Sequence, residues 1–125
     1  MATSNVKVTI SLSDIDMDDE ELQTEVENLL PQIREVDGVE DVDLVGVSET
    51  PEGAKAFGGF LLGILTAEVN PANIKALFQF LSDRFSGKPI KLKVEKNDGN
   101  KLEIEASSQA EFDYAIEKAK EFLES

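Results

Sequence analysis

Residues 53–68 read Gly-Ala-Lys-Ala-Phe-Gly-Gly-Phe-Leu-Leu-Gly-Ile-Leu-Thr-Ala-Glu, and the conformation of this stretch decides the fold. From residue 56 to residue 67 it carries no charge and holds three glycines, in a chain with a formal net charge of -14. A stretch this apolar has to be buried against its own domain, a partner or a membrane face. Its aromatic and aliphatic residues recur at spacings of three and four, so we predict a helix over 54–67 that is apolar nearly all round.

This predicted helix is too short to span a bilayer, which takes about 20 residues. Each glycine in a helix costs about 1 kcal/mol relative to alanine, so three of them indicate close approach by a neighbouring sheet, helix or second chain. The helix is therefore either a core element or partly exposed for a partner. The candidate partner-contact residues are Lys55, Phe57, Gly58, Gly59, Phe60, Gly63 and Ile64.

Two runs of alternating residues, 90–95 and 101–106, predict a β-hairpin. Apolar residues must oppose apolar residues across it, which requires the three-residue loop 97–99 with Gly99 in the left-handed conformation. The register then pairs Val94 with Leu102 and Leu92 with Ile104. The same register sets opposite charges against each other in three pairs, Lys93–Glu103, Lys91–Glu105 and Glu95–Lys101.

The N-terminal part of the chain predicts a strand, a helix and a second strand. A period of two favours a strand from Val6 to Leu12, and helical spacing with an acidic first turn favours a helix through residues 22–33. Valines mark a second strand at residues 40–47. A strand, a helix and a strand in this order favour a parallel crossover.

Capping residues mark two later helices. Asn70 and Pro71 suit the N-cap and first position of a helix that ends before Gly87. Ser108 and Glu111 have the spacing of a capping box for a last helix. We therefore expect a single domain over 1–125. Its fold class is α/β (α+β), a two-layer sandwich with a mixed four-stranded sheet, helices mainly on one face and the order β-α-β-α-α-β-β-α.

The composition excludes several classes of site. The 125 residues include no cysteine and no histidine, so the chain has no disulfide framework, thiol nucleophile, Ser-His-Asp triad or histidine metal ligand. Its 26 acidic and 12 basic residues disfavour nucleic acid, because binding a phosphate backbone needs a basic face. The first residues lack the pattern of a signal peptide. We expect a cytoplasmic protein that is not an enzyme and uses no cofactor, bound metal or membrane span.

Two alternatives use the abundant carboxylates. Asp14, Asp16, Asp18 and Glu25 have the spacing of positions one, three, five and twelve of a calcium-binding EF-hand loop. Asp19 stands where that loop needs glycine, and the helical pattern has already begun before Glu25, so an acidic helix start is the preferred interpretation. The other alternative is a small-ligand-binding or carboxylate-based enzyme domain, which requires a pocket with converging Asp or Glu residues.

The order of motifs in the second half of the chain has a family resemblance. It runs from Thr50-Pro-Glu-Gly-Ala-Lys-Ala56 and the apolar stretch to a helix carrying Leu77, Phe80, Leu81 and Arg84. It ends with Ile90-Lys-Leu-Lys-Val94, Asp98-Gly99 and Leu102-Glu-Ile-Glu-Ala106. Together these resemble the effector-associated constant component domains of predicted bacterial conflict systems. The resemblance spans most of the chain, and its motifs are structural rather than catalytic.

This resemblance implies a non-enzymatic component that is encoded with, or fused to, a variable effector such as a caspase-like or trypsin-like peptidase. It brings no catalytic residue. We expect a protein-interaction component that adapts or regulates the effector, with the apolar helix or the groove beside it meeting the effector or a second copy of the chain. Lys55 is the polar position to test first.

Overall fold

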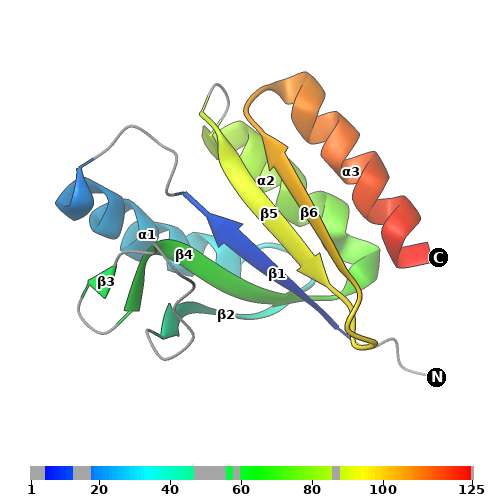
Figure 1. Ribbon diagram of the computed structural model, residues 1–125, viewed down its shortest axis with the longest axis horizontal. Helices are drawn as coiled ribbons and strands as arrows, with labels where there is room; N and C mark the ends of the chain where they lie inside the picture. The colour runs from blue at the N-terminus through cyan, green and yellow to red at the C-terminus, as the bar shows by residue number, and fades with distance from the viewer. Residues whose placement is uncertain (1–4, 13–17, 47–55, 58–59, 86–87, 125) are drawn as a thin grey trace.

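The computed structural model describes residues 5–12, 18–46, 56–57, 60–85 and 88–124 (Figure 1). The strands are β1 (Val6–Ser11), β2 (Val39–Gly46), β3 (Ala56–Phe57), β4 (Phe60–Val69), β5 (Ile90–Glu95) and β6 (Lys101–Ala106). The helices are α1 (Asp19–Arg34), α2 (Ile74–Phe85) and α3 (Gln109–Glu124), with a short 3-10 turn, Pro71–Asn73, before α2.

The prediction of a helix over 54–67 is wrong, because most of this stretch belongs to strand β4. Leu65, Ala67 and Val69 are buried, whereas Thr66 between them is half-buried and Glu68 is exposed. This is the period of two expected of a strand with one covered face. An interior strand satisfies its backbone hydrogen bonds on both sides, and β-branched residues suit that position better than a helix interior.

The sheet has the strand order β2-β4-β1-β5-β6, and the two-residue β3 pairs with β4. Every described pair of neighbouring strands is antiparallel, so the predicted mixed four-stranded sheet is corrected to an antiparallel sheet with five strands along this path. β1 and β2 run parallel to each other, as the strand-helix-strand pattern suggested, but β4 lies between them. Up to β5 the order is the split β-α-β arrangement of ferredoxin-like domains, which β6 and α3 extend.

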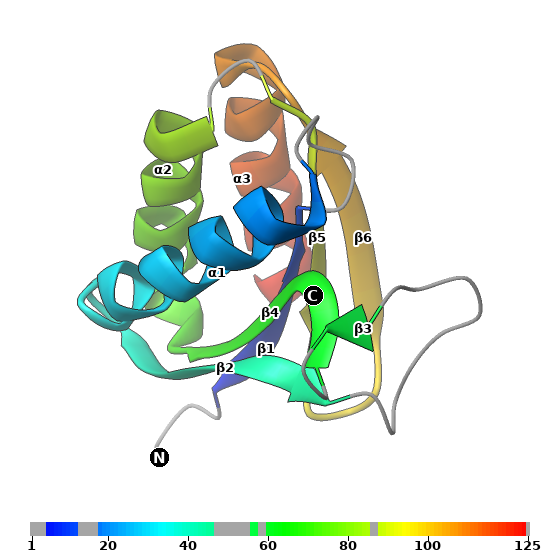
Figure 2. The same cartoon turned by 90° about the vertical axis from the view of Figure 1, so that its left-hand side faces the viewer.

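The prediction of a two-layer α/β sandwich is confirmed, since all three helices lie on one side of the sheet (Figure 2). The core between the layers is formed by alternate residues of the strands and one stripe of each helix. The largest fully buried side chains are Phe78, Phe85, Phe112, Ile10, Leu12, Leu29, Ile33, Leu65, Ile74, Leu77, Leu81 and Ile90. Asn70 caps the 3-10 turn as predicted, because its Oδ1 accepts a hydrogen bond of 3.0 Å from the backbone N–H of Ala72.

The predicted hairpin register is confirmed in full. β5 and β6 pair Val94 with Leu102 and Leu92 with Ile104, and the three opposite-charge pairs stand opposite each other as predicted. The loop is closed by hydrogen bonds from Lys96 N–H to the Asn100 oxygen and from Gly99 N–H to the Lys96 oxygen, 2.9 and 3.0 Å long. Gly99 has a φ of 91°, the left-handed conformation that the three-residue loop requires.

The start of α3 carries a capping box shifted by one residue. The Ser108 hydroxyl accepts from the Glu111 backbone N–H at 3.2 Å, as expected. The Glu111 carboxylate accepts from the backbone N–H and the hydroxyl of Ser107, at 2.8 and 2.7 Å. The two hydrogen bonds from Ser107, that of the hydroxyl being the larger cause, lower the pKa of Glu111 below its ordinary value. At α1, bonds from Glu21 lower the pKa of Asp18 in the same way.

A carboxyl group whose pKa is lower in the folded state than in the unfolded state stabilises the protein at neutral pH and loses this effect in acid. The stabilisation by Glu111 is complete above the ordinary glutamate pKa of about 4.3, and it is lost as the pH falls through the lower folded value. We therefore expect Glu111→Gln to lower the melting temperature at pH 7, and we expect that difference to shrink as the pH falls below about 4. Glu117→Gln makes the same charge change at an exposed position on the same helix and is the control. Thermal unfolding followed by circular dichroism measures both; a Glu111→Gln deficit that persists undiminished at pH 3 contradicts the assignment.

Candidate functional site

The structure separates the residues predicted to contact a partner. Phe57 lies in β3 and Phe60 at the start of β4, while Lys55, Gly58 and Gly59 lie outside the described residues. Gly63 is buried towards α1, where a Cβ atom would lie 2.8 Å from Cδ2 of Leu22. The predicted close approach to a glycine is therefore present, but the neighbour is a helix of the same chain.

Ile64 lies on the opposite side of the sheet from Gly63, because consecutive strand residues face opposite ways. It is half-buried and stands opposite Ser11 of β1. The single contact face expected from helical spacing therefore does not exist. The surface that Ile64 does join is the side of the sheet that carries no described helix (Figure 2).

We call this surface the open face. It consists of the outward residues of five strands: Asp41 and Asp43 of β2; Ile64, Thr66 and Glu68 of β4; Lys7, Thr9 and Ser11 of β1; Lys91, Lys93 and Glu95 of β5; and Lys101, Glu103 and Glu105 of β6. Hydroxyl groups occupy its centre and charges its flanks. Only the β5 and β6 part was recognisable from the sequence, because the pairing of β1 with β4 and β5 joins segments far apart in the chain.

The hydrogen-bonding pattern fixes which side chains on the open face are closest. Leu12 N–H donates to the Gly63 oxygen at 2.8 Å, so the bonded pairs between β1 and β4 alternate from that point. Thr9 and Thr66 consequently form a pair without mutual backbone bonds, the kind in which side chains approach most closely. By the same alternation Thr9 and Lys93 form a bonded pair.

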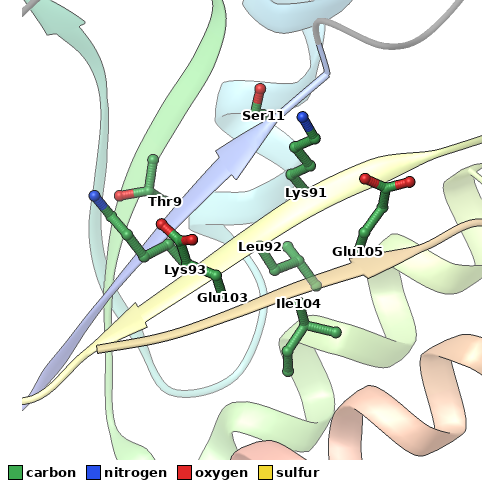
Figure 3. Close-up of a pocket in the computed structure, with 8 residues that line it drawn as sticks. All are labelled: Thr9, Ser11, Lys91, Leu92, Lys93, Glu103, Ile104 and Glu105. Atoms are coloured by element: carbon green, nitrogen blue, oxygen red, sulfur yellow. The ribbon is translucent and has the colours of Figure 1, made fainter. Parts of the chain in front are cut away.

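A shallow hollow of about 460 Å³ lies on the open face over β1, β5 and β6 (Figure 3). Thr9, Ser11, Lys91 and Lys93 line it from the two inner strands, and the carboxylates of Glu103 and Glu105 line it from β6. Leu92 and Ile104 also border it, although Figure 3 shows their side chains directed to the helix side. The hollow is open to solvent and bordered by charged and hydroxyl-bearing side chains, whereas small-molecule sites are usually enclosed.

The hollow contains one pair that resembles catalytic machinery. Ser11 and Lys91 are register partners, and Figure 3 shows their hydroxyl and ammonium groups on the same side of the sheet. A Ser–Lys dyad activates its serine with a lysine that is desolvated by burial. Lys91 is exposed, so the geometry favours a binding surface over a catalytic dyad.

The acidic residues of the calcium alternative are used elsewhere in the described part of the chain. Asp18 caps α1, with its Oδ1 accepting from Glu21 N–H at 2.8 Å. Glu25 lies within α1 and forms an ion pair with Arg84 of α2. Asp14 and Asp16 lie outside the described residues. Among the residues that are described, no group of three or more carboxylates is placed to hold a metal ion.

Comparison of the chain with models of protein families, with curated proteins and with solved structures finds no match. The resemblance to effector-associated constant component domains therefore stays a prediction. Within the described ranges, no helix has the length and apolar character needed to cross a membrane.

Proposed function

We propose that this protein is a non-enzymatic interaction component that binds an acidic segment of an effector protein on the open face, over Lys7, Lys91 and Lys93. The observation that carries this proposal is the concentration of lysines on two adjacent inner strands of a strongly acidic chain. The chain has 12 basic residues and 26 acidic residues. Three of those twelve project from β1 and β5 onto one helix-free surface.

The chemistry of the side chains supports an acidic protein segment as the occupant. Each of the three lysines can donate charge-assisted hydrogen bonds to a carboxylate of the partner. Carboxylates also stand opposite these lysines in the sheet, so binding depends on direct pairing at the lysines and not on a net positive charge of the face. Thr9, Ser11 and Thr66 add hydroxyl groups that can donate hydrogen bonds to carboxylate or backbone oxygens. Glu103 and Glu105 stand opposite Lys93 and Lys91 on β6 and limit where the negative charges of the partner can lie.

The predicted biological setting is a bacterial effector or conflict system, as the family resemblance implies. The component then adapts or regulates an associated effector, such as a caspase-like or trypsin-like peptidase. The partner-contact surface moves from the supposed apolar helix to the open face, because residues 60–69 form an interior strand. The small-ligand alternative is less favoured, since the hollow is open to solvent.

A binding measurement with the product of the neighbouring gene tests this function. We expect isothermal titration calorimetry to show association, and Lys93→Glu to weaken it at least about tenfold, the effect of about 1.4 kcal/mol at the interface. Lys93 is only partly buried on the open face, so the variant should fold normally. Lys120→Glu makes the same charge change at an exposed site on α3 and is expected to bind within about twofold of the original protein.

Two outcomes count against the proposal. Absence of binding to the neighbouring gene product would remove the effector setting. Equal weakening by Lys93→Glu and Lys120→Glu would show that overall charge, and not the open face, governs the association.

A further inference from the structure

The two edges of the sheet differ in how their backbone groups are protected. At the β2 edge, Val42 N–H donates to Oδ1 of Asp41 at 3.0 Å, and Leu44 N–H donates to Oδ1 of Asp43 at 2.9 Å. Arg34 donates from Nη2 to the Val42 oxygen at 2.9 Å. These side chains occupy the groups that another strand would use, so the β2 edge is closed to strand addition.

At the β6 edge the outward backbone groups belong to Lys101, Glu103 and Glu105. The hydrogen bond from Lys96 N–H to the Asn100 oxygen fixes which pairs of the hairpin are bonded. The backbone N–H and C=O groups of the even-numbered residues of β6 therefore face β5, and those of the odd-numbered residues face away from it. β6 ends the sheet, and the described part of the chain places no strand beyond it. The side chains of the three outward residues are exposed on the open face.

The β6 edge is complementary to itself in antiparallel pairing. If Glu103 stands opposite Glu103 of a second copy, Lys101 of each copy stands opposite Glu105 of the other. A row across the joined sheets then reads Glu95, Lys101, Glu105, Lys91, with alternating charges. The two Glu103 carboxylates meet at the axis, and each is flanked by Lys93 of its own copy.

The helix side of the same strand supplies an apolar contact. Leu102 and Ile104 are half-buried, while the other inward residues of the hairpin are fully covered. In the same register Leu102 of one copy stands opposite Ile104 of the other, so pairing would cover both. The hairpin is also locally neutral in an acidic chain, with four lysines and four carboxylates: Lys91, Lys93, Lys96, Lys101, Glu95, Asp98, Glu103 and Glu105.

We propose that two copies of this chain associate through antiparallel pairing of their β6 strands, with Glu103 at the two-fold axis, to form one continuous sheet. This pairing is independent of effector binding. It uses backbone hydrogen bonds for attachment and the alternating charges for register.

Cysteine cross-linking tests the register, because the chain contains no cysteine of its own. Backbone-bonded partners have Cα atoms about 5.5 Å apart, within the range that a disulfide can bridge. We expect oxidised Glu103→Cys to form a covalent dimer on a non-reducing gel. Glu105→Cys is the matched control and is expected to stay monomeric on the gel, since its two copies are separated by four residues along the strand. Cross-linking of Glu105→Cys in preference to Glu103→Cys overturns this pairing.

Light scattering after size exclusion tests the dimer itself. We expect the unmodified protein to have the mass of two chains, and the Glu103→Pro variant to have the mass of one chain. Proline at this position removes only an N–H that is directed away from β5, so the melting temperature should stay close to that of Glu103→Ala, which remains dimeric. A monomeric unmodified protein, or a dimer that survives Glu103→Pro, overturns the proposal.

Discussion

Replacing Leu65 by alanine is expected to lower the free energy of unfolding by about 2–5 kcal/mol, while Thr66→Ala changes it by about 0.5 kcal/mol or less. Leu65 is fully buried on the helix side of β4, opposite Ile10 of β1 and Leu44 of β2. Thr66 is its direct neighbour but lies on the open face. Total stabilities of small domains are about 5–15 kcal/mol, so the first substitution removes a large part of the total.

Urea denaturation at neutral pH measures this difference. The contrast between adjacent residues is the signature of a strand, because a helix that is apolar all round would penalise both substitutions. Similar losses for Leu65→Ala and Thr66→Ala would therefore contradict the assignment of β4. Val69 continues the buried side of the strand, so Val69→Ala should also cost more than Thr66→Ala.

Replacing Gly38 by alanine is expected to cost about 2–5 kcal/mol, from backbone strain and a steric clash together. Gly38 has a φ of 86°, and its carbonyl accepts a hydrogen bond of 2.8 Å from Asn70 N–H. An added Cβ would lie 2.1 Å from the Cβ of Asn73, an atom that cannot move without its backbone. The substitution thus forces apart the loop that follows α1 and the turn that precedes α2, which are joined by this hydrogen bond.

Gly99→Ala is the matched control for this prediction. Gly99 has a similar φ of 91°, but an added Cβ would meet no atom within 4 Å. Backbone strain alone should cost about 1–2 kcal/mol there. Chemical denaturation measures the free energy of unfolding of both variants, and the difference between them gives the cost of the clash at Gly38. Equal losses of stability would show that Asn73 moves aside and that the clash contributes nothing.

The elements that the sequence predicted correctly depend on local patterns. The register of β5 and β6 follows from short-range alternation and one turn glycine, so it could be predicted residue by residue. The apolar stripe of α2 and the Asn70 cap before it are equally local.

β4 was missed because its partners are distant in the chain. Its apolar residues from Phe60 to Leu65 satisfy helical and strand patterns alike, and only the pairing with β1 and β2 selects the strand. Two signals in the sequence favoured the strand: the alternation of Thr66, Ala67, Glu68 and Val69, and the cost of glycines in a helix. The open face was missed for the same reason, because Thr9 and Ser11 meet Lys91 and Lys93 only through this sheet order.

Both proposed surfaces belong to a sheet in which residues 60–69 form the strand between β1 and β2. A designed disulfide between Thr9 and Thr66 tests this placement most directly, since close non-bonded pairs have Cα atoms about 4.5 Å apart. We predict that each chain of oxidised Thr9→Cys/Thr66→Cys loses both free thiols and the mass of two hydrogen atoms, with no covalent link between chains. Thr9→Cys/Leu65→Cys, whose side chains face opposite sides of the sheet, is predicted to keep its thiols. Two free thiols in the first variant, or equal cross-linking of both, would contradict the position of β4.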